Sequence, residues 1–457
     1  MGVPVSALVI AVFGLVVVAY VSVSRRLERW HITAPIVFTL VGTVIGLVAA
    51  EPPDAVQVHR LAELTLALIL FRDAAQVRPR QLQSDAAVCA RLLLLGLPLT
   101  ILFGFVVARL LMPGIGTWLA LLVAAALAPT DAGLGAATVL NPVVPVRIRR
   151  ILNVESGLND GLSTPVVLFA IAAAGGAEAG SAGTFGAAVA ELAVGVLVGV
   201  LIGAGCGRLL SSAQRSAHIG SGLLSVGTLA VPLACYYGAI AIHGNGFVAA
   251  FVAGIAFAAA FLAAATPTPS GRPADEQALE FAEWTSTALG YAVWTLFGAV
   301  GVARLDTVDA WRGPAFAFLS LTALRMIPVA LVLVGSRLRS LTVLYIGWFG
   351  PRGLASVVFA LIAVETLPAT PELEAAIGTV TITVLLSVVL HGVTAGPWAR
   401  NYGRWVTRTG PAEELRPEPD RRGSSGETPF WKGRRGLSRV PLDFGGGPRD
   451  RQAAVTS

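Results

Sequence analysis

The stretch LLVAAALAPTDAGLG (residues 121–135) places an ionisable side chain, Asp131, in the middle of an otherwise apolar segment. Just before it, Pro129 lacks an amide hydrogen and opposes helix continuation. Just after it, Gly133 and Gly135 permit unusual backbone angles. In a membrane, such a charge costs roughly 2.5–3.5 kcal/mol on insertion scales, so it needs a functional reason. The stretch therefore predicts a helix that breaks in mid-membrane; a proline kink with a snorkelling aspartate is the alternative.

The composition of the whole chain supports a membrane setting. Of its 457 residues, 55% are hydrophobic and only 13% are charged, whereas ordinary soluble domains carry about 25% charged residues. A bilayer-spanning helix needs about 20 mainly apolar residues, and such segments recur from residue 3 to residue 396. We expect an all-α, polytopic membrane protein with inverted repeats and without a soluble catalytic or nucleotide-binding domain.

The apolar segments predict thirteen transmembrane spans. They are 3–22, 33–50, 58–75, 85–110, 117–140, 152–174, 184–210, 220–241, 246–265, 282–302, 313–334, 341–362 and 373–396. Alternate connections hold sixteen arginines, and the intervening connections hold three. Because cytoplasmic loops are enriched in Arg and Lys, this bias predicts an outside N-terminus and a cytoplasmic C-terminus at the cell membrane. An odd number of spans satisfies that orientation.

Two regions of the chain differ in composition. Residues 1–400 form the predicted transmembrane domain, and residues 401–457 are predicted to be a disordered cytoplasmic tail. The stretch from Pro411 to Ser457 is rich in Gly, Pro, Ser, Arg and Glu and has few large apolar residues to bury. The net charge of +6 is scattered through short loops and the tail, which fits membrane orientation and not nucleic-acid binding.

A second polar motif, ESGLND (residues 155–160), opens the span that follows the first broken helix. In a helix, Ser156 and Asp160 share one face, and Glu155 and Asn159 share the neighbouring face. A carboxylate with a hydroxyl is a hard-oxygen site suited to Na⁺, K⁺ or H⁺. We expect Asp160 to bind a proton and a cation in alternation, which would couple their fluxes. The alternative is a polar helix start near Asn153.

Two buried arginines are expected to have partners in the membrane. Arg325 lies in an apolar stretch with no other charge, so we expect an ion pair with Glu155, leaving Asp160 free to titrate. A direct ligand role for Glu155 is the alternative. Arg352 is flanked by Gly350, Pro351 and Gly353, which predicts a second broken helix whose carbonyl end it compensates. An anchor at the cytoplasmic edge is the alternative for this arginine.

Asp73, near the cytoplasmic end of its span, has two open interpretations. It could line an ion entrance, or it could pair locally with Arg72 or Arg78. The histidines His59, His243 and His391 lie near span ends, where interfacial or packed roles are commoner than proton relays.

Four segments together resemble a known family. Ala128–Asp131, Glu155–Asp160, Gly347–Gly353 and Leu390–Thr394 are similar to those of NhaP-like bacterial sodium/proton exchangers of the monovalent cation:proton antiporter family. The resemblance covers residues 5 to about 400 in order and spacing. It implies two broken helices that cross at an ion site, alternating access, and a homodimer with a mobile core domain. It implies no cofactor; the partners are H⁺, Na⁺ or another monovalent cation, and the lipid bilayer.

The resemblance also implies roles for individual residues. Asp160 would be the ion- and proton-binding carboxylate, and Asp131, the carbonyl of Thr130 and Ser156 would complete the ion site. Asn159 and the Glu155–Arg325 pair would be supporting elements, and the Asn-Asp pair is associated with electroneutral one-for-one exchange.

One departure affects the crossing geometry, because many relatives carry Thr-Asp-Pro where this chain has Thr130-Asp131-Ala132. Three other functions remain open. A K⁺/H⁺ exchanger shares all of this chemistry. A passive channel or sensor needs a continuous pore, and the sequence has no repeated filter motif. An intramembrane aspartyl protease needs two carboxylates close enough to share a proton.

Overall fold

The computed structural model describes residues 5–30, 32–48, 55–77, 79–131, 134, 141–176, 182–216, 218–264 and 274–415. Each of the thirteen predicted spans overlaps a helix or an interrupted helix in these ranges. In chain order, the first half contains α1 (Val5–Arg29), α2 (Ala34–Val48), α3 (Ala55–Gln76), α4 (Pro79–Arg91), η1 (Leu92–Gly96), α5 (Leu97–Leu111), η2 (Pro113–Ile115), α6 (Thr117–Ala126) and α8 (Val146–Gly175).

The second half of the chain is also helical in the ranges that the structure describes. It contains α9 (Ala182–Arg215), α10 (Ser221–Ile240), α11 (Gly246–Ala264), α12 (Ala274–Gly301), η3 (Val302–Thr307), α13 (Arg312–Leu321), α14 (Ala323–Val332), α15 (Ser340–Trp348), α16 (Leu354–Thr366) and α17 (Pro371–Thr409). Among the described segments, seven helical stretches are long and apolar enough to cross a membrane, and four further apolar helices are shorter. The architecture is therefore that of an all-helical, polytopic membrane protein.

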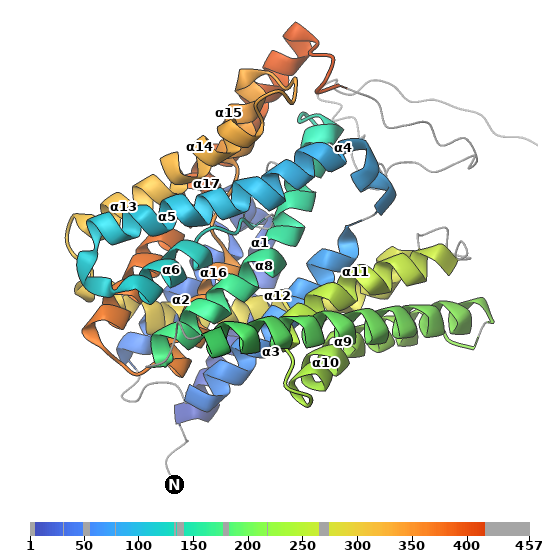
Figure 1. The fold of residues 1–457 in the computed structure, drawn as a ribbon, viewed down its shortest axis with the longest axis horizontal. Coiled ribbons are helices and arrows are strands. Elements are labelled where there is room, and N and C mark those ends of the chain that lie inside the picture. Colours follow the sequence, from blue (N-terminus) through green and yellow to red (C-terminus); the bar gives the residue numbers. More distant parts are fainter. Residues whose placement is uncertain are drawn as a thin grey trace, which may run out of the picture. The chain divides into compact units, whose positions relative to one another are not determined.

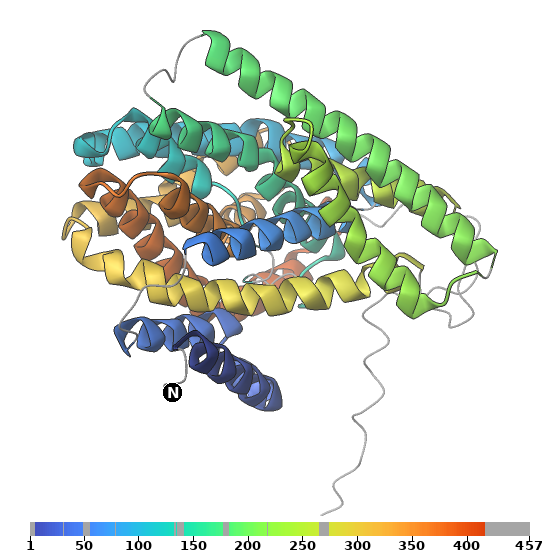
Figure 2. The same ribbon diagram turned by 90° about the horizontal axis from the view of Figure 1, so that it is seen from below.

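The helices form two groups that meet at α8 and α16. In one group α9, α10 and α11 pack on one another, α10 and α11 also pack on α3, and α12 packs on α2. In the other, α5 packs on α6 and α14, and α17 packs on α13 and α16 (Figure 1). The helices α8 and α16 contact both groups, since each also touches α3. Figure 2 shows α9 on the outer side of α10 and α11.

Several element boundaries differ from the predicted ones. Helix α8 begins at Val146, six residues before the predicted start at Leu152, so the ESGLND motif lies well inside it. The predicted span 313–334 is interrupted at Thr322, where α13 ends and α14 begins. A threonine with ordinary flanking residues carries no breaker signal, which is why the sequence does not predict this break.

The predicted boundary between the transmembrane domain and the tail, at residue 400, is wrong, because α17 continues to Thr409. The helix ends at Gly410, whose φ of 52° is left-handed. Residues 411–415 then return to the helices. Glu414 is buried, and its carboxylate accepts hydrogen bonds from the amide of Arg339 and the hydroxyl of Thr342, both 2.8 Å. Residues from 416 onward, which contain most of the predicted tail, lie outside the described residues.

A buried arginine also holds this C-terminal segment. The Arg147 guanidinium donates to Asp85 at 2.6 Å, to the Glu413 carboxylate at 3.1 Å and to the Glu413 carbonyl. We call the contacts that Glu413 and Glu414 make with Arg147, Arg339 and Thr342 the C-terminal clasp. The clasp connects the end of α17 to the start of α8, which carries candidate site residues, and to the start of α15, which leads into the second break.

Candidate functional site

The two helix breaks that the sequence predicts lie against each other. After α6 ends at Ala126, residues 127–131 are not helical, and residues 349–353 separate α15 from α16. The amide of Asp131 donates to the carbonyl of Pro351 at 2.8 Å, which joins the two interruptions. Gly133 and Gly135 lie outside the described residues. The geometry confirms a break at Pro129 and excludes a simple proline kink.

Arg352 satisfies the carbonyl end of the first broken helix. It is fully buried, and its guanidinium donates to the carbonyls of Ala128 at 3.0 Å and Pro129 at 3.2 Å. It also donates to the carbonyl of Ser320 at 3.1 Å, close to the break between α13 and α14. Cations are stabilised at helix C-termini, where carbonyls lack partners. The predicted compensation is thus present, and the edge-anchor alternative is wrong.

Asp131 makes the reciprocal contact at the start of α16. The residue at the N-cap, Gly353, has no side chain, and the Asp131 carboxylate accepts a hydrogen bond from the amide of Leu354 at 3.0 Å. A second, longer bond of 3.4 Å comes from the amide of Leu134. Negative charge is favoured at a helix N-terminus. The carboxylate that the sequence assigns to the ion site therefore also caps a helix.

Thr130, Ser156 and Asn159 form one buried hydrogen-bonded group. The Ser156 hydroxyl donates to the Thr130 carbonyl at 2.5 Å, and the Asn159 amide donates to the Thr130 hydroxyl at 2.7 Å. All three side chains are buried. The group ties the first break to α8, so a movement of one requires a movement of the other.

Asp160 follows on the same helix and is 5% exposed. Within the described ranges, its Oδ1 atom has no hydrogen-bond partner, and the charged groups near enough to act on its carboxyl are Asp73, Asp131 and Arg72. Its own carbonyl accepts from Ser163 and Thr164. A buried carboxyl with an unsatisfied oxygen can be stabilised by a proton or by a cation, which is the competition that exchange requires. Since α8 begins at Val146, the polar-helix-start alternative is wrong.

The surroundings of Asp160 come from the opposite helix group. A Cβ on Gly161 would lie 2.1 Å from the ring of Phe251 on α11, and a Cβ on Gly157 would lie 3.2 Å from the carbonyl of Asp73 on α3. These glycines let α3 and α11 approach α8 beside the carboxyl. Asp160 is thus positioned where the two helix groups meet.

The predicted ion pair between Glu155 and Arg325 is present. The Arg325 Nη2 atom lies 2.5 Å from the Glu155 carboxylate, and the two side chains are 3% exposed or less. Among the described residues, Oε2 of Glu155 and Nε of Arg325 have no hydrogen-bond partner. Each charge therefore depends on the other for compensation.

Asp73 pairs locally, as one of its two interpretations expects. Its carboxylate accepts from Arg72 at 2.7 Å, and both side chains are partly buried. The pair is also among the charges that act on Asp160. The geometry is compatible with a place beside an ion path, which keeps the second interpretation open.

Two polar residues of α17 support the second break and were not singled out for this from the sequence. The Ser387 hydroxyl accepts from the amide of Arg352 at 2.7 Å, and His391 bonds the carbonyl of Trp348 at 3.0 Å. Both are buried, so His391 is a packed histidine. Their spacing of four residues on one helix face is a signal, but many packed helices share it.

No group of three or more His, Cys, Asp or Glu side chains suited to a bound metal occurs in the part of the chain that the structure describes. The sequence predicts Asp160 and Asp131 as ligands of a transported cation, which would be cargo and not a resident metal. Such a site needs carboxylate, hydroxyl and carbonyl oxygens, and the crossing region supplies all three kinds.

Comparison with known proteins agrees with this architecture. The family model of the transmembrane sodium/hydrogen exchangers matches residues 12–401. A Na⁺/H⁺ antiporter of Schizosaccharomyces pombe is 27% identical over 315 residues, which cover 62% of this chain and 65% of that protein. This chain thus matches slightly less than two thirds of the length of that curated relative.

Two solved structures of one antiporter share the fold. The sodium proton antiporter MjNhaP1 from Methanocaldococcus jannaschii at pH 8 has a TM-score of 0.69 and 20% identity, covering 88% of this chain and all of that one. An electron-microscopy structure of the same antiporter has a TM-score of 0.66 and 20% identity, covering 86% and 97%. With the family model matching most of its length, the chain belongs to the sodium/hydrogen exchanger family of membrane transporters.

Proposed function

We propose that this chain exchanges Na⁺ for H⁺ across the cell membrane by alternating access, with Asp160 as the carboxyl that binds each in turn. The observation that carries the proposal is the position of Asp160. It is buried beside two crossing helix breaks, with an oxygen that lacks a partner in the described residues. Membership of the sodium/hydrogen exchanger family supports Na⁺ over K⁺.

Cation binding would use oxygens that the crossing brings together. Asp160 supplies the charge, and Ser156, Thr130 and Asp131 supply neighbouring oxygens from α8 and the first break. Because Arg352 and Asp131 already satisfy the half-helix ends, the net charge of the site changes mainly at Asp160. One proton would then replace one monovalent cation, so the exchange would be electroneutral, with the uncharged Asn159 beside the carboxyl.

Alternating access would be a movement of one helix group against the other. The site helices α8 and α16 lie where the groups meet, so sliding at Gly157 and Gly161 would expose Asp160 first to one side and then to the other. We place the N-terminus outside and the C-terminus in the cytoplasm, in line with the arginine bias of the connections. A homodimer built on the α9–α12 group is part of this proposal.

The test is exchange by purified protein in acid-loaded vesicles that contain a fluorescent pH dye. Na⁺, K⁺ and Li⁺ are added in turn to wild type, to Asp160→Asn and to Glu372→Gln, which removes an exposed carboxyl outside the site. We expect Na⁺ to cause proton release in vesicles with wild type and with Glu372→Gln. With Asp160→Asn, proton release should be no greater than in vesicles without protein. An imposed membrane potential should leave the rate unchanged.

The other outcomes separate the remaining functions. An active Asp160→Asn variant would show that the site assignment is wrong. Proton release with K⁺ alone would make the chain a K⁺/H⁺ exchanger. Silence of wild type with every cation, together with ion conductance in bilayer recordings, would favour a channel.

A further inference from the structure

The imidazole of His391 ties α17 to the second break and is only 1% exposed. Its Nε2 atom lies 3.0 Å from the carbonyl oxygen of Trp348, the last residue of α15. Its Nδ1 atom lies 3.0 Å from the carbonyl oxygen of Ser387 and 3.3 Å from the hydroxyl of the same residue. The ring therefore has a carbonyl oxygen, which can only accept, beside each of its nitrogens.

These partners fit two protonation states of the ring and not one. A neutral imidazole carries a single N–H, whereas an imidazolium donates from both nitrogens. The neutral ring with its proton on Nε2 donates to the Trp348 carbonyl and accepts from the Ser387 hydroxyl at Nδ1. The charged ring donates to the Trp348 carbonyl and to the Ser387 carbonyl. Protonation thus keeps the bond to the break and takes from the Ser387 hydroxyl its acceptor.

The Ser387 hydroxyl connects this choice to the crossing of the two breaks. It accepts a hydrogen bond from the amide of Arg352 at 2.7 Å. The guanidinium of Arg352 in turn donates to the carbonyls of Ala128 and Pro129 at the first break. A change in the bonding of the imidazole therefore reaches the first break through one serine and one arginine.

Trp348 is held by α17 at a second point. Its indole N–H donates to the hydroxyl of Thr394 at 3.1 Å, and its ring centroid lies 5.5 Å from that of His391. Its carbonyl also accepts from the amide of Gly350 at 2.8 Å. Two side chains of α17, about one turn apart, thus fix the residue at which α15 ends and the second break begins.

The charges around the ring act in opposite directions on its protonation. Arg352, from the second break, is the charged group that acts on the imidazole within the described residues, and it repels a second positive charge. Arg325 of α14 and Glu155 of α8 act on Arg352 in turn. Burial also opposes a charged ring, while the two carbonyl oxygens stabilise it.

We propose that His391 is a positioning residue of the ion site and that exchange slows when its imidazole gains a proton. The proposal rests on the exchange of Na⁺ for H⁺ through Asp160 and adds a second titrating group to it. Histidine changes its charge at about pH 5–8. With a neutral ring, hydrogen bonds run without interruption from Trp348 through His391 and Ser387 to Arg352. With a charged ring, the series is interrupted at Ser387 and the new charge faces Arg352.

Three variants separate the hydrogen bond from the titration. His391→Gln keeps an N–H donor at the position of Nε2 but gains no proton, and His391→Phe removes both properties. His218→Gln is the matched control, because His218 is an exposed histidine on the connection between α9 and α10. Each purified protein is placed in vesicles with the same pH on both sides. Exchange is started with Na⁺ and its rate is measured over about pH 5–8.

We expect wild type and His218→Gln to lose exchange together as the pH falls. His391→Gln should exchange like wild type at the alkaline end and lose exchange only at a lower pH. His391→Phe should be slower at every pH, by roughly three- to tenfold, because the break loses a buried hydrogen bond to α17. A glutamine variant with the pH profile of wild type, or a phenylalanine variant as fast as wild type, would overturn the proposal.

A spectroscopic measurement tests the ring itself, independently of transport. Protein with isotope-labelled histidine is titrated by NMR, and the signals of His391 are those absent from His391→Gln. We expect a protonated Nε2 and a bare Nδ1 at about pH 8, and two protonated nitrogens at about pH 5. A ring that keeps one proton throughout would also overturn the proposal. A wild type without any exchange would count against the proposed function, and the titration would still decide whether His391 changes partners.

Discussion

At the scale of single residues, the sequence was most informative where a charge is buried. A buried guanidinium needs a compensating group, so the partners of Arg325 and Arg352 could be predicted without coordinates. The contact between Asp131 and the amide of Leu354 could not, because it depends on how two distant segments cross. The carboxylate of Asp131 is attractive as an ion ligand and equally suited to a helix cap, and only the geometry shows the cap.

The Glu155–Arg325 pair gives a residue-scale prediction. Replacing one member, as in Glu155→Ala or Arg325→Ala, leaves the other charge buried without its partner, which costs about 3–5 kcal/mol. The double variant Glu155→Leu/Arg325→Met removes both charges and should recover most of the melting temperature. Thermal unfolding in detergent measures all three.

Transport by the same variants separates a structural pair from an ion ligand. If the pair only holds helices in register, the double variant should retain Na⁺-driven proton release in vesicles. A double variant that is stable but inactive would instead give Glu155 a direct part in transport, the alternative that the sequence leaves open.

At the scale of elements, the crossing of the two breaks depends on a glycine. Gly353 has an unexceptional φ of −139°, but a Cβ there would lie 2.0 Å from the Asp131 carboxylate and 2.3 Å from its Cβ. We expect Gly353→Ala to force the crossing apart, to cost about 1–3 kcal/mol and to reduce exchange strongly. Thermal unfolding and vesicle transport would measure the two effects.

A matched glycine on α17 serves as the control for that substitution. Nothing lies within 4 Å of a Cβ built on Gly392, so Gly392→Ala should leave transport unchanged and stabilise the helix slightly. If both alanine variants behave alike, the close approach at Gly353 has no part in the site.

The C-terminal clasp gives a second element-scale prediction. Glu414 is buried and accepts two hydrogen bonds. The side chain of Glu413 is 30% exposed, and Arg147 would still form its ion pair with Asp85 if Glu413 were removed. We expect Glu414→Ala to lower stability by about 1.5–3 kcal/mol and Glu413→Ala by less than about 1 kcal/mol. Their melting temperatures in detergent provide the comparison. Equal effects would show that burial of Glu414 is not what holds the segment.

Element boundaries were harder to predict than element existence, and the reasons are local. The start of α8 carries Arg147, Arg149 and Arg150, so a helical turn resembles a charged loop. The last turns of α17 are also basic, and the sequence places them in the tail. In both places tertiary contacts support a polar turn that hydropathy alone excludes. The break at Thr322 has no proline or glycine to announce it.

At the scale of the whole molecule, hydropathy predicted the helical passes because each must satisfy its own backbone in lipid. It does not predict which helices group together. That grouping follows from close contacts such as Gly161 with Phe251 and the glycines of α9 with α11, which are visible only once the chain is folded. The same contacts place the candidate site between the two helix groups. The path of a transported ion therefore depends on how the helices pack and cannot be predicted from the sequence motifs alone.

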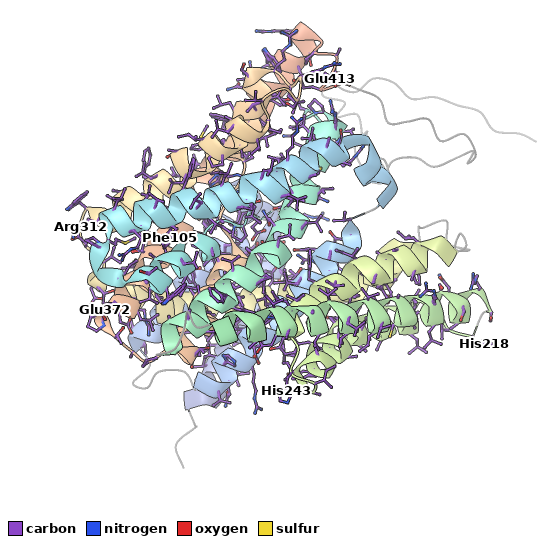
Figure 3. All side chains as sticks on the ribbon, in the orientation of Figure 1. Phe105, His218, His243, Arg312, Glu372 and Glu413 are labelled. Atoms are coloured by element: carbon purple, nitrogen blue, oxygen red, sulfur yellow. The ribbon has the colours of Figure 1, made fainter. Side chains whose placement is uncertain are left out.

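The orientation of the molecule in the membrane can be tested on a single helix. Glu372 and Arg400 are exposed residues near opposite ends of α17, 28 positions and about 42 Å apart. The bilayer core is about 30 Å thick, so the two side chains should lie on opposite sides of it. Figure 3 shows Glu372 beside Arg312 at one end of the helices and Glu413 at the other.

The arginine bias predicts which end faces outward. In intact cells, a membrane-impermeant maleimide should label Glu372→Cys, and it should label Arg400→Cys only after permeabilisation. Wild type gives the background, because its cysteines are buried or partly buried. The reverse labelling pattern would place the C-terminal clasp on the outer surface.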